Sequence, residues 1–228
     1  DAGGRRYRFG AQPSIASWNL ARLAESLVPL SDKALLGEAL ERFPVVFTSH
    51  HDAMMRRKLG LGEARDDDQQ LFGALFETLH AAETDMTLFY RALAALPLDG
   101  VEVATAPPAS LVEPLADSWY APDTVGHDVR RRFADWVRRY AERVRAEGGT
   151  DARRRVTMAE TNPVIVPRNY LAQEAIDAAG AGDRGPLESL LDATSRPYDE
   201  ALAGSRFAAK RPDWARHRAG CSMLSCSS

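Results

Sequence analysis

Apolar residues recur with helical spacing along most of this chain, and that periodicity constrains the fold more than any other feature. In segment 128–147, arginines occupy much of one side, and the other side carries Val129, Phe133, Trp136, Val137, Tyr140 and Val144. Similar patterns predict helices over 15–30, 31–43, 46–59, 69–79, 84–96 and 170–179, and a short helix opening at Pro186. The best strand-like stretch, 101–103, is too short to seed a sheet. The sequence therefore predicts an all-α fold.

Proline and glycine divide the predicted helices. Pro44 is expected to kink or end the second helix, and Gly60 and Gly62 to end the third. The segment 98–127 contains several prolines and is expected to be a linker or an insertion of irregular structure. The predicted organisation is a helical part over 1–97, this proline-rich segment over 98–127, and a helical region with a cysteine-containing tail over 128–228.

Composition excludes several classes of protein. With 228 residues, 27% charged residues and a net charge of −3, the chain is neither wholly disordered nor a polybasic nucleic-acid binder. No apolar run approaches the roughly 20 residues needed to cross a membrane. Two cysteines are too few for a disulfide-stapled secreted scaffold, and this sequence shows no n-region/h-region pattern of a signal peptide. The chain starts at Asp1 rather than Met, so we expect a piece of a longer protein.

Gly180, Gly182 and Gly185 match the spacing of a nucleotide-binding glycine motif. That motif requires a strand before its first glycine, whereas the residues before Gly180 are predicted to be helical. A turn between two helices explains these glycines better. We therefore expect no nucleotide site at this position.

Two short polar runs resemble metal sites but lack the required spacing. Adjacent helical residues point about 100° apart, so His50 and His51 of the His50-His51-Asp52 run cannot easily bind one ion. Asp66-Asp67-Asp68 lacks the alternating ligands and turn glycine of a calcium loop. It directly precedes a predicted helix, where negative charge is favourable. A solvated helix face and a helix cap, respectively, are the preferred interpretations.

The arginines between Arg130 and Arg155 could bind phosphate, nucleic acid or an acidic partner. Trp136 and Tyr140 have the spacing of core residues on the same helix, however, and not of exposed stacking aromatics. A solvated face on a core helix is the preferred interpretation, with partner binding as the alternative.

The tail carries both cysteines, Cys221 and Cys226, among small residues and outside any apolar periodicity. Thiols in such a tail are expected to be accessible. Together with His217 they supply at most three zinc ligands, whereas a structural zinc site needs four. A redox or disulfide-forming role is favoured over zinc binding and over an incidental pair of cysteines.

Several ordered motifs together resemble the selenoprotein O family over nearly the whole chain. They include Tyr7-Arg8-Phe9-Gly10-Ala11-Gln12-Pro13-Ser14, Trp18 to Glu25, Met55 to Leu61, Thr84 to Phe89, Asn162-Pro163, Pro167-Arg168-Asn169-Tyr170, Arg196-Pro197-Tyr198 and Pro212-Asp213-Trp214-Ala215. The ending from Pro212-Asp213-Trp214-Ala215 to Cys226-Ser227-Ser228 is the most specific match, and family members with selenocysteine carry it third from the end, where this chain has Cys226.

The resemblance implies a protein adenylyltransferase with a protein-kinase-like, pseudokinase fold, which transfers AMP from ATP to Ser, Thr or Tyr hydroxyls of target proteins and uses Mg²⁺ or Mn²⁺. The family's Asp-Tyr-Gly and Asp-Asn motifs do not occur in this sequence. We therefore expect the helical C-terminal lobe, with the catalytic, ATP-binding and metal-binding residues upstream of Asp1 and none of them in this chain. By itself the chain is expected to be inactive and to bind no cofactor.

The resemblance also implies partners and a location. The expected partners are the missing N-terminal kinase-like half and protein substrates, with no nucleic acid and no membrane, in the bacterial cytoplasm. Cys226 is the expected redox-sensitive residue, and in the full protein it is expected to pair with an upstream cysteine. In this chain alone it would be free, or bonded to Cys221 or to another chain. The alternatives are a non-enzymatic helical interaction module and a thiol–disulfide regulatory element.

Overall fold

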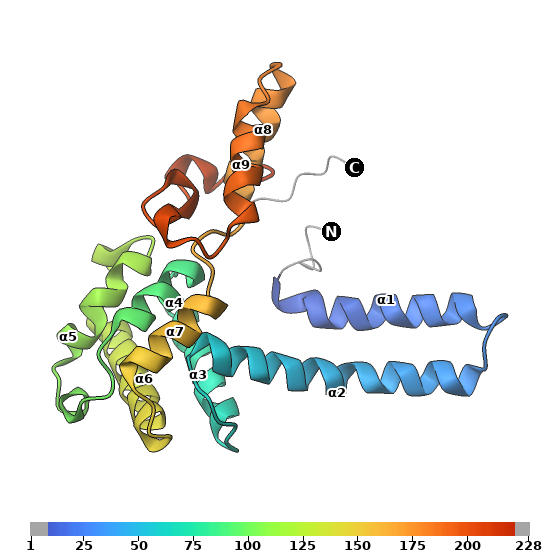
Figure 1. Ribbon diagram of the computed structural model, residues 1–228. Coiled ribbons are helices and arrows are strands. Elements are labelled where there is room, and N and C mark those ends of the chain that lie inside the picture. The colour runs from blue at the N-terminus through green and yellow to red at the C-terminus, as the bar shows by residue number, and fades with distance from the viewer. Residues whose placement is uncertain (1–8, 222–228) are drawn as a thin grey trace. The chain divides into compact units, whose positions relative to one another are not determined.

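A computed structural model describes residues 9–221, and these residues form helices and no strand. The prediction of an all-α fold is confirmed. None of the described helices is both long and apolar enough to cross a bilayer. The α-helices shown in Figure 1 are α1 (Gln12–Leu27), α2 (Lys33–Lys58), α3 (Asp68–His80), α4 (Met86–Ala95), α5 (Pro108–Val112), α6 (His127–Ala146), α7 (Asp151–Thr161), α8 (Asn169–Gly180) and α9 (Gly185–Ser195).

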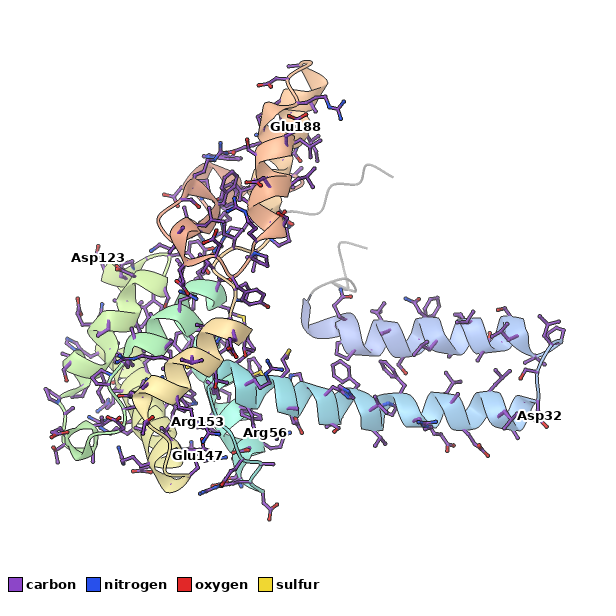
Figure 2. The ribbon with its side chains drawn as sticks, in the orientation of Figure 1. Asp32, Arg56, Asp123, Glu147, Arg153 and Glu188 are labelled. Carbon is purple, nitrogen blue, oxygen red and sulfur yellow. The ribbon has the colours of Figure 1, made fainter. Side chains whose placement is uncertain are left out.

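The chain divides into two compact units at Met54 and Met55, within α2. The first unit is a helical hairpin in which α1 and the first part of α2 run antiparallel (Figure 1), joined by a turn near Asp32, which Figure 2 labels. Asp32 accepts a hydrogen bond from the backbone N–H of Ala34 at 2.7 Å, which stabilises the start of α2. Among residues 10–54 no side chain is buried.

The second unit contains the hydrophobic cores, the largest of which lies among α3 to α7. Aromatic rings form its centre, because α6 directs its apolar stripe inwards as its periodicity predicts. The ring centroids of Trp119 and Phe133 are 5.0 Å apart, and those of Trp136 and Tyr140 are 5.2 Å apart. Trp119, Phe133 and Tyr140 are fully buried.

The proline-rich segment 98–127 belongs to this same core. It forms α5 and three short 3₁₀ helices, η2 (Val101–Ala104), η3 (Glu113–Ser118) and η4 (Pro122–Thr124). The strand-like residues 101–103 thus lie in a helical turn. Leu98, Leu115 and Trp119 have no exposed surface, so the segment packs against α4 and α6 instead of spanning between separate parts.

Two smaller cores join α8, α9 and the C-terminal segment. One contains Tyr170, Leu171, Leu190, Ala215 and Cys221. The other contains Val164, Ile165, Ala193 and Ala208. The remaining 3₁₀ helices are η1 (Phe9–Ala11), η5 (Glu200–Leu202), η6 (Arg206–Ala208) and η7 (Asp213–Ala215).

Two predicted boundaries differ from the structure. Helix α2 continues through Pro44 to Lys58, so the two helices predicted over 31–43 and 46–59 are one. Helix α7 (Asp151–Thr161) forms where no helix was predicted, because its arginines hide the apolar period. Gly182 has a φ of +90° and lies in the turn between α8 and α9, as expected for the rejected glycine motif.

Candidate functional site

The carboxylate of Asp85 lies at the centre of a buried polar cluster. Asp85 directly precedes α4, and its Oδ1 accepts a hydrogen bond from the backbone N–H of Leu88 at 3.1 Å, which caps the helix. The guanidinium of Arg168 donates to both carboxylate oxygens, at 2.5 and 3.2 Å. The hydroxyl of Tyr120 donates to Oδ2 at 3.2 Å. Because Asp85 is 5% exposed, Arg168 compensates a charge that is costly to bury alone.

The pKa shifts of Arg168 and Tyr120 keep both groups in the protonated forms that donate hydrogen bonds to Asp85. Burial alone lowers the pKa of Arg168, but its hydrogen bonds to Asp85 and the charge of that carboxylate raise the pKa above the usual value. The pKa of the Tyr120 hydroxyl is raised, first by burial and then by the charge of Asp85. Both groups therefore retain their protons at neutral pH.

A second carboxylate, Glu83, bonds to the C-terminal segment next to the Asp85 cluster. Glu83 accepts hydrogen bonds from Arg211 at 2.6 Å and from Arg216 at 2.8 Å. Burial alone would raise the pKa of Glu83, but the two guanidinium groups hold it below its usual value. Lys210 donates to the backbone oxygen of Trp119 at 2.9 Å. The cluster thus joins the start of α4 to residues that follow it by more than 100 positions.

A cavity of about 220 Å³ lies between α4 and α7. Its lining includes Tyr90, Met158 and Asn162, and Tyr90 and Asn162 are almost fully buried. Among the described residues, neither the Tyr90 hydroxyl nor Oδ1 of Asn162 has a hydrogen-bond partner. The guanidinium groups at its edge are already bonded, since Arg91 donates to the backbone oxygen of Asn162 and Arg155 to that of Ala94. The cavity is mainly apolar and offers no cation without a partner to an anionic ligand.

Lys58 lies beside this cavity, at the end of α2. Its ammonium nitrogen is 4.4 Å from the ring centroid of Tyr90, a cation–π contact. Burial lowers the pKa of Lys58. The amide of Asn162 donates to the backbone oxygen of Lys58 at 2.8 Å, and so ties the end of α7 to the end of α2.

A second buried network joins α3 to α6. Nε of Arg143 donates to Asp68 at 2.8 Å, and its other nitrogens donate to Glu147 at 2.9 Å and to the backbone oxygen of Glu63 at 2.7 Å. Glu147, labelled in Figure 2 at the C-terminal end of α6, accepts a hydrogen bond from the backbone N–H of Gly62 at 3.0 Å. The network thus attaches the loop between α2 and α3 to α6.

A third network fixes the C-terminal end of α4. Arg154 is 2% exposed and donates to the backbone oxygens of Leu93 at 3.0 Å and of Leu96 at 2.5 Å. The Leu93 oxygen also accepts from the backbone N–H of Leu96 at 3.3 Å, and Arg154 adds a cap supplied by α7. Asp151 balances its charge at 2.9 Å and accepts from the backbone N–H of Leu98 at 2.8 Å.

These arrangements determine what the described part of the chain can do chemically. The central carboxylates of the three networks, Asp85, Asp68 and Asp151, are each bonded to an arginine. Within residues 9–221, no group of three or more His, Cys, Asp or Glu side chains is placed to hold a metal ion. The networks join helices and leave no carboxylate of theirs free to act as a base or to bind Mg²⁺.

The candidate residues from the sequence fall in different places. His50 contacts the backbone oxygen of Val46 at 2.9 Å, and His51 contacts Asp52 at 3.3 Å, so the two histidines do not converge. The expectation of a solvated arginine face is wrong for Arg143 and Arg154, which are buried because their guanidinium groups bond to carboxylates and backbone oxygens.

Two further expectations concern Asp68 and the cysteines. Asp68 is part of α3 itself. Its side chain forms the ion pair with Arg143 and accepts a hydrogen bond from the backbone N–H of Arg65 at 3.1 Å.

The expectation of an accessible thiol is wrong for Cys221, which is 6% exposed and packs in the core with Tyr170. The redox role of Cys221 stays a prediction. Cys226 lies outside the described residues.

The link between Asp85 and Arg168 was not identified from the sequence. A signal was present, because both residues lie within motifs that carry the family resemblance, Thr84 to Phe89 and Pro167-Arg168-Asn169-Tyr170. Asn162, from a third such motif, bonds to Lys58 from a fourth. The structure therefore shows that these separate motifs converge as connections between helices.

The fold and these networks define a helical scaffold in which buried arginines join distant elements. The chain belongs to the family described as protein adenylyltransferase SelO, whose model matches residues 1–195.

Curated relatives match the whole of this chain. It is 47% identical to the protein nucleotidyltransferase YdiU of Azoarcus sp. (strain BH72) over 229 aligned residues, which cover 100% of this chain and 42% of that protein. It is 45% identical to the proteins of the same name from Rhodopirellula baltica and Xanthomonas euvesicatoria pv. vesicatoria, again over 100% of this chain and over 43% and 42% of theirs. The chain thus spans less than half the length of these relatives.

Proposed function

We propose that this chain is the C-terminal part of a protein adenylyltransferase with a kinase-like fold, acting in the bacterial cytoplasm. The observation that carries the proposal is the match of the whole chain to 42% of relatives named protein nucleotidyltransferases. The full protein transfers AMP from ATP to Ser, Thr or Tyr hydroxyls of target proteins. The hydroxyl oxygen loses its proton and forms a bond to the α-phosphorus, the bond from that phosphorus to the oxygen bridging to the β-phosphorus breaks, and pyrophosphate leaves with that oxygen.

The residues that hold ATP and Mg²⁺ or Mn²⁺ are proposed to lie in the part of the protein outside this chain. Metal ions in such reactions neutralise the charge that develops on the phosphate oxygens. The described residues do not fit this group, since the buried carboxylates are committed to arginines and no cluster of potential ligands is present among residues 9–221. The role proposed for this chain is to hold the helices that support the active site and help present the protein substrate.

The test compares this chain with the full-length Azoarcus relative. Each is incubated with ATP labelled in the α-phosphate, with Mg²⁺ or Mn²⁺ and a bacterial lysate as substrate. Labelled protein is expected with the full-length relative and not with this chain alone. Robust transfer by this chain alone would contradict the assignment of the catalytic groups to the other part. Absence of transfer by the full-length relative would contradict the adenylyltransferase activity.

A redox-sensitive C-terminal cysteine is the second element of the proposal. Cys226 is the residue assigned to it, because Cys221 is buried and its thiol reacts only after local opening. In the full protein, Cys226 is proposed to pair with an upstream cysteine. Replacing Cys226 by Ser is expected to remove the response of AMP transfer to oxidants, and an unchanged response would refute this role.

The structure favours the adenylyltransferase scaffold over a general interaction module based on the arginine-rich helix. On α6, Arg131 pairs with Asp128, and Arg138 pairs with Asp135 and donates to the backbone oxygen of Ala106, so these two arginines already have partners within the protein. Charge reversal at Arg131, Arg138 and Arg139 is expected to leave protein partners bound. Loss of a partner in that variant would support the interaction module.

A further inference from the structure

The hairpin of α1 and the first part of α2 exposes an unusual amount of apolar surface. Seventeen large hydrophobic residues are strongly exposed in the described part of the chain, and ten of them lie in residues 18–54. The other seven are spread over residues 76–214. Exposed apolar residues in such a concentration mark an interaction surface.

Three of these exposed residues, Leu20, Leu23 and Phe47, belong to apolar helical stripes whose other members are partly buried. On α1, Leu20, Leu23 and Leu27 follow each other at spacings of three and four residues, and Leu23 is 54% exposed. On α2, the same spacing continues over three turns through Leu36, Leu40, Phe43 and Phe47. None of these four residues is fully buried. We call these two stripes together the hairpin face.

The two helices cannot cover this face by themselves. No residue among 10–54 is buried, even though the stripes lie on neighbouring antiparallel helices (Figures 1 and 2). The Phe43 and Phe47 rings, with centroids 6.0 Å apart, contact each other along one helix and do not build a core between two helices. A helical pair needs a further layer against its apolar side to form a core.

The rest of the family fold is the occupant that fits this face. The curated relatives contain more than half of their length outside the region matched by this chain. A covalently attached segment acts at an effective concentration near the millimolar range, so it covers an apolar face before a second chain can. The second unit already buries its own apolar residues in three cores and exposes few large ones.

We propose that the hairpin face is the docking surface for the kinase-like part of the protein that this chain does not contain. This inference rests on the proposed function, which places that part upstream. It adds that the contact is apolar, that it is made by α1 and the first part of α2, and that the arginine networks of the second unit are not needed for it.

The experiment uses hydrogen–deuterium exchange on the unmodified full-length Azoarcus relative and on this chain alone. Backbone amides aligned with α1 and with residues 33–54 are expected to exchange at least ten times more slowly in the full-length protein than in this chain. Equal exchange in the two proteins would overturn the proposal. The test is then repeated with glutamate at the two positions aligned with Leu23 and Phe47, which should abolish the difference.

The matched control places lysine at the positions aligned with Glu38 and Glu41, which lie on the opposite side of α2. It is expected to keep the slow exchange. Slow exchange that persists in the glutamate variant would overturn the proposal. A concentration dependence in this chain alone would also overturn the proposal. If its amide exchange slows as its concentration rises, and Leu23→Glu with Phe47→Glu removes that slowing, the hairpin face binds a second copy of the chain.

AMP transfer is measured separately, so that the two proposals can fail independently. Slow exchange without AMP transfer supports the docking surface and contradicts the proposed activity. AMP transfer with equal exchange in the two proteins supports the activity and contradicts the docking surface.

Discussion

At the scale of single residues, buried arginines connect elements that are distant in the sequence. Arg168 reaches Asp85, Arg143 reaches Asp68, and Arg154 reaches the last carbonyls of α4. Arginine suits this use because its planar guanidinium has five donors and stays charged when buried. The same residue type that suggested a solvated face therefore provides the internal connections.

Replacing Asp85 by Ala should leave Arg168 buried without its counter-charge and remove the cap of α4. We expect a loss of about 3–5 kcal/mol in the free energy of unfolding, measured with urea. The matched control is Asp128→Ala, because Asp128 pairs with Arg131 on the exposed side of α6. That change should be close to neutral. Equal effects of the two substitutions would contradict the central role of Asp85.

Gly60 offers a second test, since its φ is +67° and an added Cβ would lie 2.6 Å from Cγ of Arg154 and 2.9 Å from its backbone oxygen. Gly60→Ala should therefore combine backbone strain of about 1 kcal/mol with a steric clash. Gly182→Ala is the control, because Gly182 also has a positive φ but has nothing within 4 Å of the added atom. Thermal unfolding should show the larger loss for Gly60→Ala.

The stability of the chain should fall in acid through its paired carboxylates. Burial alone would raise the pKa of Asp151, but Arg154 and the backbone N–H of Leu98 hold it below its usual value. The stabilisation is therefore complete above the unfolded pKa of about 4 and is lost as the pH falls through the lower folded value. Urea unfolding between pH 7 and pH 2.5 should show this loss.

Asp151→Asn is the variant that isolates this contribution. It should be less stable than the wild type at pH 7 and should lose less stability between pH 5 and pH 2.5. An identical acid dependence in the variant would show that another group causes the effect.

At the scale of elements, apolar periodicity predicted the helices that pack on one side. The stripe of α6 was read correctly because Phe133, Trp136 and Tyr140 alternate regularly with charged residues. Helix α7 was missed since its buried face is formed largely by Arg154 and Met158, and an arginine is not counted as a core residue. The short helices of 98–127 were missed because prolines there occupy first-turn positions, where they begin a helix and do not break it.

The candidate networks depend on pairings that no local pattern contains. Asp85 was expected near a helix start, and it is the cap of α4. Its partner Arg168 is 83 residues away, and nothing in the periodicity of either segment joins them. Motif resemblance marked both residues as members of a family pattern, but only the fold shows that they meet.

Helix α2 contains a proline at its interior, and this gives a prediction for the element. Pro44 removes one backbone hydrogen bond, at a cost of about 3 kcal/mol to an interior helical position. Pro44→Ala should slow hydrogen exchange in the neighbouring turns of α2, while α6 remains unchanged as an internal control. Unchanged exchange around residue 44 would show that tertiary contacts already hold that turn.

At the scale of the whole molecule, stability is concentrated in the second unit. The three apolar cores consist of residues between Met55 and Cys221. A chain that begins at Ser49 should therefore retain a cooperative thermal transition, with a Tm within about 2–4 °C of the original. Loss of the cooperative transition on removing residues 1–48 would show that the hairpin supports the cores.

The long separation between Glu83 and its partners also has a consequence for synthesis. Arg211 and Arg216 follow Glu83 by 128 and 133 residues. At translation rates of about 5–20 residues per second, roughly 6–27 s pass between the synthesis of Glu83 and the synthesis of these two arginines. During that interval the start of α4 can bond to Tyr120 and Arg168 but not to the C-terminal arginines, so the final closure of the second unit must follow the synthesis of Arg216.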